Sequence, residues 1–199
     1  MAEISINPSL TTNAAGSFNV QSLGFIQGMA LDDPSVRNEL AGGYLDAAET
    51  LPMWGGVAIE ELIAAVTESR GPSIKRAADN TLLTGFSVFN QNHAAINTPQ
   101  SPVPLTPSGM LVNFYRLGSG ARIPLKIDPA LVTLEGEIIT TQVSWDFANQ
   151  QIIAYSGGIG ALDVRVLEVA VGNSLTVSYD AGTGFATWNR SGTVAIVVI

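Results

Sequence analysis

The sequence contains no cysteine and a single histidine, and these absences remove several classes of chemistry. Without cysteine among its 199 residues, the chain can form no disulfide, zinc–thiolate site, iron–sulfur cluster or cysteine nucleophile. A Ser-His-Asp triad would have to use His93, which lies among Asn and Gln residues, and no G-x-S-x-G nucleophile motif is present. The sequence therefore predicts that the protein is not an enzyme and that His93 is a polar surface residue.

Charged residues are also scarce. They make up 13% of the chain, about half of the roughly 25% found in typical globular domains. The 17 acidic and 9 basic residues give a net charge of -8. We therefore expect binding to neither nucleic acid nor an anionic membrane. Few charges favour a protein that buries surface against partners. An ordinary extracellular or viral β domain with a Ser/Thr/Asn surface is an alternative, and the two are compatible.

Long apolar runs are missing as well. The first ten residues, MAEISINPSL, lack a basic stretch followed by an apolar one, so no signal peptide is expected. No segment approaches the roughly 20 apolar residues of a membrane span. We expect a protein that is made in the cytoplasm and either stays soluble or is assembled there.

The patterns that are present predict a mainly β (α+β) fold, with an antiparallel β-barrel or sandwich in the C-terminal half. Val143, Trp145 and Phe147 alternate with polar residues, Asn149 follows at a turn, and residues 152–155 supply a second strand, so a hairpin is expected here. Pro124 should confine its strand to a sheet edge. The strands expected from Gly85 onward cover residues 85–89, 111–117, 122–127, 131–134, 138–147, 152–155, 164–171, 174–179, 185–189 and 193–199.

One amphipathic helix is expected at about residues 57–69. Ile59, Leu62, Ile63 and Val66 fall at i, i+3, i+4 and i+7, which makes one apolar stripe on a helix. Gly71 and the proline after it suit a helix C-terminus.

Two further regions complete the expected organisation. Residues 1–50 carry little periodicity and predict an extended N-terminal arm, with a short helix from Asp33 to Glu39. Residues 51–199 would form the helix and the β-rich domain. Within that domain, residues 97–109 contain four prolines and predict an extended surface loop.

No residue pattern predicts a cofactor or metal site. Glu135 and Glu137 could be imagined as paired carboxylates of a glycosidase, but Gly136 between them favours a solvated turn. Asp32 with Asp33, and Asp79 with Asn80, do not follow the EF-hand spacing and are better explained as caps or turns.

Four stretches of the chain resemble the capsid cement (decoration) proteins of tailed bacteriophages. They are QGMALDDPSVRNELAGGYLDAAETLPMWGGVAIEE, GSGARIPLKIDPALVTLEGEI, QVSWDFANQQIIAY and TGFATWNRSGTVAIVVI, which together span most of the chain. The resemblance implies a protein on the capsid exterior of a virion, bound where major capsid proteins meet, which stabilises the shell against internal DNA pressure. It implies the major capsid protein and other copies of the same chain as partners, and no reaction and no cofactor.

Five bulky or stiff residues without an evident core partner are the candidate contacts with the shell or with another subunit. They are Phe18, Phe25, Trp54, Pro102 and Pro104. For Trp54, a place in the core is the alternative.

Two other functions remain open. A tail-tube or other minor virion protein would share the β-rich fold, but a tail-tube protein would polymerise by itself. A carbohydrate-binding module would need exposed aromatic residues, for which Trp145, Trp188 and Tyr155 are available, although the alternation around Trp145 favours a core position.

Overall fold

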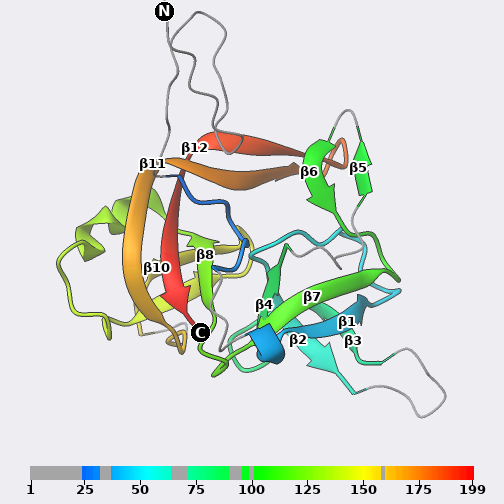
Figure 1. Cartoon of the computed structure of the whole chain (residues 1–199), viewed down its shortest axis with the longest axis horizontal. Helices are drawn as coiled ribbons and strands as arrows, with labels where there is room; N and C mark the ends of the chain where they lie inside the picture. The colour runs from blue at the N-terminus through cyan, green and yellow to red at the C-terminus, as the bar shows by residue number, and fades with distance from the viewer. Residues whose placement is uncertain (1–23, 32–36, 64–70, 90–95, 99–100, 158–159) are drawn as a thin grey trace, which may run out of the picture.

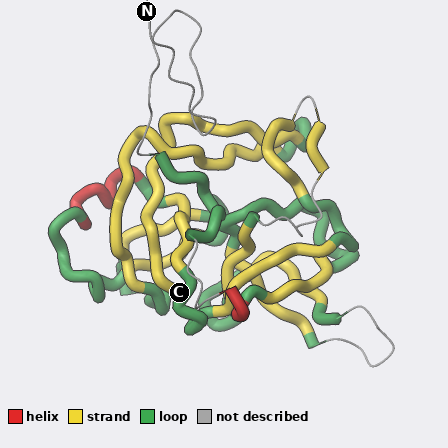
Figure 2. Tube along the Cα trace, in the orientation of Figure 1, coloured by secondary structure: helices red, strands yellow, loops and turns green. Residues whose placement is uncertain are grey.

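The computed structural model describes residues 24–31, 37–63, 71–89, 96–98, 101–157 and 160–199. Strands make up 50% of the structure and helical segments 5%, so the predicted mainly β fold is confirmed (Figure 1). The only helical segments of the described chain are two short 3-10 turns, η1 (Arg37–Glu39) and η2 (Pro129–Leu134) (Figure 2).

Five strands close into a barrel. Their order is β1 (Ala41–Leu45), β3 (Ser73–Arg76), β2 (Ala58–Leu62), β4 (Gly85–Val88) and β7 (Leu111–Arg116), which pairs with β1 again. All pairs are antiparallel except that of β1 with β3. A barrel is therefore present, but it is closed by residues 41–116 and not by the C-terminal half, where the sequence placed it.

The C-terminal half instead forms a three-stranded sheet beside the barrel (Figure 1). Its order is β11 (Arg165–Asp180), β12 (Phe185–Val198) and β8 (Arg122–Lys126). Since β8 ends this order, the edge position predicted from Pro124 is confirmed. Four separate strands were expected, at residues 164–171, 174–179, 185–189 and 193–199, where β11 and β12 each run through. Pairing between β11 and β12 instead continues through this region, with shifts in register between residues 170 and 176. Such irregularities bend a strand without ending it, and this stretch is called the bend of β11 below.

Two small hairpins complete the fold. The predicted hairpin is confirmed as β9 (Val143–Asp146) and β10 (Gln151–Ala154), with Ile152 opposite Trp145. The expected proline-rich loop is wrong in part, because β5 (Ile96–Thr98) and β6 (Ser101–Leu105) pair within it.

The helix expected at residues 57–69 is wrong over its first half, where β2 lies, and residues 64–70 are outside the described chain. The helical stripe is coincidental, since Ile63 is fully exposed. Residues far away in the sequence pair with Glu60 and Glu61 and favour the strand conformation of β2 over a helix. Glu60 lies opposite Lys75 of β3, with Nζ and Oε1 2.7 Å apart, and Glu61 forms two 2.7 Å hydrogen bonds with Arg116 of β7. Such cross-strand pairs hold the two acidic residues in a strand.

Two more expected strands are wrong. Residues 131–134 belong to η2, where Pro129 begins the turn and the Asp128 side chain accepts a hydrogen bond from the Ala130 N–H. Residues 138–142 form turns, so the strand expected there is shortened to β9. The helix expected over residues 33–39 lies partly outside the described chain, and its last residues form η1.

The described part of residues 1–50 packs on the domain. β1 is a barrel strand, and residues 24–31 cross between the barrel and the sheet. The Gly28 N–H donates to Pro124 of β8, and the Phe89 N–H donates to Gly28. The Gln27 side chain is buried and accepts a hydrogen bond from the Val177 N–H at 2.9 Å. These bonds tie the segment to β8, to β11 and to Phe89, the residue after β4.

Two hydrophobic cores result, and residues next to each other on β2 and β7 divide between them. Ile59 and Phe114 pack in the barrel core, whereas Ala58 and Tyr115 pack in the core shared with the C-terminal sheet. The long hairpin contributes to both, through Val169 and through Val177 with Ala186. Strands buried on both faces lose the apolar–polar alternation of half-exposed strands.

Candidate interaction surface

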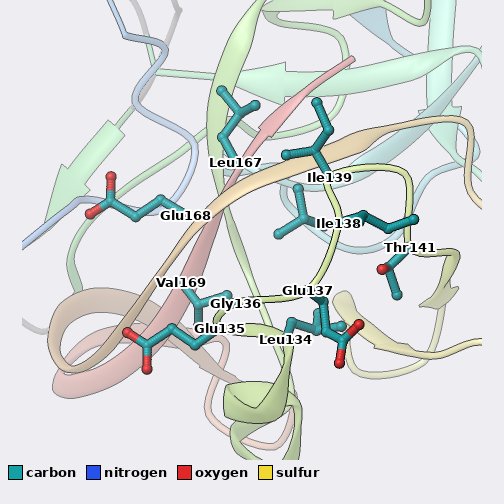
Figure 3. Close-up of a pocket in the computed structure, with 11 residues that line it drawn as sticks. Leu134, Glu135, Gly136, Glu137, Ile138, Ile139, Thr141, Leu167, Glu168 and Val169 are labelled. Carbon is teal, nitrogen blue, oxygen red and sulfur yellow. The ribbon is translucent and has the colours of Figure 1, made fainter.

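An open groove lies between β11 and the loop that follows η2 (Figure 3). Its volume is about 230 Å³, below the roughly 300–1,000 Å³ of sites that enclose small molecules. The Gly136 backbone has φ 87°, in the left-handed region that favours glycine, and turns the loop alongside the strand. The residues lining the groove are Leu134, Glu135, Gly136, Glu137, Ile138, Ile139, Thr141, Val166, Leu167, Glu168 and Val169.

Large aliphatic side chains at the groove are open to solvent. Ile138 is 72% exposed, Ile139 48% and Leu167 43%. In Figure 3, Leu167 and Ile139 extend to the same side of β11. Single exposed apolar side chains are common, but a group of them around one depression is typical of a binding surface.

Three carboxylates surround these aliphatic side chains. Glu135, Glu137 and Glu168 are exposed, and within the described residues no ion pair involves any of them. The groove therefore combines an apolar surface with uncompensated negative charge.

The groove borders a strand edge that is open over half of its length. Beyond the bend, β11 is covered: Leu175 and Phe25 share a 2.8 Å backbone hydrogen bond, and Ile26 pairs with Leu175 in parallel. Before the bend, residues 166–171 pair with β12 on one side, and no described segment hydrogen-bonds to their other side. A strand with an unpaired row of N–H and C=O groups is a template for a further strand.

None of the four described residues among those proposed from the sequence lines this groove. Phe18 is outside the described residues. Phe25 is half-buried on the covered part of β11, Pro102 is exposed on β6, and Pro104 is half-buried there. The four described candidates surround the far half of the β11–β12 hairpin, since β6 packs beside β12 and Trp54 lies against Tyr179.

Trp54 belongs to the barrel core. Trp54 is 7% exposed, and its ring centroid lies 5.3 Å from that of Tyr179. The Arg76 guanidinium lies 4.4 Å from the Trp54 ring centroid. Burial lowers the pKa of Arg76 to about 10, while nearby Glu49 favours its charged form. This arrangement stabilises the fold and leaves little Trp54 surface for a partner.

The aromatic residues considered for carbohydrate binding form no exposed platform. Trp145 is fully buried, with its ring centroid 4.9 Å from Phe86, and Trp188 is half-buried against Phe89. Tyr155 is 40% exposed, and is the only one of the three predicted residues with that much open surface.

The polar residues considered for catalysis or metal binding lie in turns and bends wherever the structure describes them. Glu135 and Glu137 occupy the solvated turn that Gly136 indicated, and His93 lies outside the described chain. Among the residues that the structure describes, no three acidic or histidine side chains gather as a metal site would require. In the same residues, no helix has the length and apolar character to cross a membrane.

Sequence reasoning missed the groove because its parts are distant in the chain. Ile138 and Ile139 were assigned to one strand and Leu167 to another, and the order of the strands did not follow from the sequence. One signal was available: the apolar pair directly follows Glu135, Gly136 and Glu137, which already indicated a solvated turn.

In comparisons with known proteins, no family model, no curated protein and no solved structure matches the chain.

Proposed function

We propose that the protein is a structural component of a tailed-phage virion, which binds the outer surface of the capsid and cements adjacent major capsid proteins. The observation that carries this proposal is the aliphatic groove beside the open edge of β11, on a chain with only 13% charged residues. A surface of this kind favours binding to a protein. The resemblance of four sequence stretches to cement proteins supports the same role, and the role requires no reaction and no cofactor.

A small contact is sufficient for such a role. The three exposed aliphatic residues of the groove, Ile138, Ile139 and Leu167, offer a modest area to a partner. Many copies around a shell would act together, because linking weak sites raises the overall affinity without new contacts. The proposed partners are therefore the major capsid protein and other copies of this chain.

Co-sedimentation tests the proposal. The purified protein is mixed with expanded capsids and, separately, with unexpanded procapsids of a phage that encodes it, after its own copies have been removed from the shells. We expect saturable binding to expanded shells at a fixed ratio to the major capsid protein. Absence of binding to both shells would refute the cement role.

The alternative of a tail-tube protein keeps one supporting observation, the open edge of β11, through which copies could join into rings. Electron microscopy of the protein alone separates the two roles. A cement protein should remain a small oligomer, whereas a tail-tube protein should form rings or tubes without any capsid.

A further inference from the structure

We infer that the open edge of β11 binds an extended segment of the partner that carries aliphatic side chains and at least one lysine or arginine. The segment would add a strand at residues 166–171 and place an aliphatic side chain in the groove. That the partner is the major capsid protein rests on the proposed function. The chemistry of the segment rests on the groove itself.

The strand edge supplies the first argument. Farther along, β11 already pairs with a short stretch of backbone through an isolated bridge at Ile26, where Leu175 exchanges hydrogen bonds with Phe25 and Gln27, at 2.8 and 2.9 Å. The stretch before the bend has the same open side and no described occupant. Strand addition to an exposed edge is a general way to bind an extended peptide, with affinity from the backbone and specificity from alternate side chains.

The groove supplies the second argument. Its volume of about 230 Å³ suits the side chains of a single extended segment and not a folded domain. Ile138 and Ile139 on the loop line it together with Leu167 on β11, and Leu167 and Ile139 extend to the same side of that strand (Figure 3). An aliphatic side chain placed there would remove apolar surface on both sides from water, which stabilises the complex.

Charge decides between possible occupants. Glu168 lies on the open edge itself, and Glu135 and Glu137 lie on the loop beside it. A second copy that paired through the same edge would bring like charges together, and charged residues on edges oppose such pairing. Residues 1–23 of the chain contain Glu3 and no lysine or arginine, so they offer no compensating charge. A cationic segment of another protein is the occupant that fits.

Peptide binding followed by nuclear magnetic resonance tests this inference without a capsid. The probes are acetyl-Val-Lys-Val-Lys-Val-amide, the same peptide with glutamate in place of lysine, and the lysine peptide methylated on alternate backbone nitrogens. We expect the lysine peptide to shift amide resonances of residues 134–141 and 166–171, and to bind at least about tenfold more tightly than the glutamate peptide. Backbone methylation should weaken binding, because it removes donors that strand addition needs.

A pair of matched variants separates the groove from net charge. Glu135→Gln with Glu168→Gln removes two charges at the groove, and Glu39→Gln with Asp163→Asn removes two elsewhere. We expect the first variant to bind the lysine peptide about fivefold more weakly and the second to bind as the unaltered protein does. The remainder of each amide spectrum reports whether the fold is intact.

Four results would overturn the inference: no binding of the lysine peptide, shifts away from residues 134–141 and 166–171, equal affinity for the two peptides, or insensitivity to methylation. Capsid co-sedimentation of the same variants keeps this test apart from the proposed function. If the groove variant binds expanded shells as well as the control variant, the cement role stands and the groove is not its contact. If neither binds, the cement role fails, and the peptide result still decides what the groove recognises.

Discussion

Acidic and aliphatic residues are paired or buried in the barrel, whereas at the groove the same kinds of residue are exposed. In the barrel, acidic Glu60 and Glu61 face Lys75 and Arg116 at 2.7 Å, and the aliphatic side chains point into a core. At the groove, acidic residues have no described ion-pair partner, and aliphatic side chains remain exposed. The barrel pairs its acidic residues within the fold, whereas the groove leaves its acidic and aliphatic side chains open to solvent. Changes in the barrel and its adjoining core should therefore reduce stability, and changes at the groove should reduce binding.

The largest effect is expected from Trp145→Ala. Trp145 is fully buried between the hairpin and the barrel, against Phe86. Its removal leaves a cavity, so we expect the free energy of unfolding to fall by about 3–5 kcal/mol, measured by urea denaturation. Tyr155→Ala, on an exposed residue of the same segment, is the control and should change it little. A loss below about 1 kcal/mol for Trp145→Ala would contradict the packing described.

The next effect concerns the close approach of two barrel strands. A Cβ atom on Gly85 would lie 2.1 Å from the carbonyl oxygen of Tyr115 on β7. Gly85→Ala must push these backbones apart, and we expect a loss of about 3 kcal/mol in thermal or chemical unfolding. Gly109→Ala is informative as a comparison, since open space surrounds that glycine and only its positive φ of 79° opposes the change. Equal losses would argue against closure of the barrel at this pair.

A smaller effect is expected at the turn of the predicted hairpin. The Asp146 side chain accepts hydrogen bonds from the Ala148 N–H at 2.9 Å, the Asn149 N–H at 3.1 Å and the Asn149 amide at 2.7 Å. Burial opposes its ionisation, but these bonds together lower the pKa of Asp146 below its ordinary value of 3.8. Asp146→Ala should cost about 1 kcal/mol at neutral pH.

The pH dependence of that effect has a definite sign. Because the folded-state pKa of Asp146 is lowered, its stabilising contribution is present above pH 3.8 and is lost as the pH falls through the lower folded value. The difference between the unaltered protein and Asp146→Ala should therefore shrink in acid, as unfolding at a series of pH values would show. A difference that grows in acid would contradict the assigned bonds.

The smallest effect on stability is expected at the groove. Ile138 is 72% exposed, so Ile138→Ser should change the free energy of unfolding by less than about 0.5 kcal/mol. The same change should weaken binding to expanded shells, measured by co-sedimentation. A large loss of stability would place Ile138 in the core, and the contrast between barrel and groove would then disappear.

Local features of the fold could be predicted from the sequence, and closure of the barrel could not. Trp145 and its neighbours alternate with period two, and Pro124 cannot donate to a ladder, so the hairpin and the edge strand follow from nearby residues. β2 does not, because Glu60 and Glu61 are held in a strand by Lys75 and Arg116, which lie far from them in the sequence. The stripe from Ile59 to Val66 satisfies helical spacing equally well.

The candidate surface shows the same limit. The turn at Gly136 was expected, but exposure of Ile138 and Leu167 depends on how the loop lies against a strand about thirty residues later. Trp54 was proposed as a contact, with the core as the alternative, and the structure places its ring in the barrel core, against Tyr179 and Arg76. A bulky side chain followed by two glycines is compatible with both a core position and a contact position, so the local sequence could not decide between them for Trp54.

Amide hydrogen exchange of the shell-bound protein tests the central claim most directly. The protein is compared free and bound to expanded capsids, peptide by peptide. We predict that binding slows exchange at residues 134–141 and 166–171 and leaves the barrel strands β1, β2 and β3 unchanged. Protection that falls on the barrel and spares the groove would show that the shell is held by the opposite region, and would contradict the account.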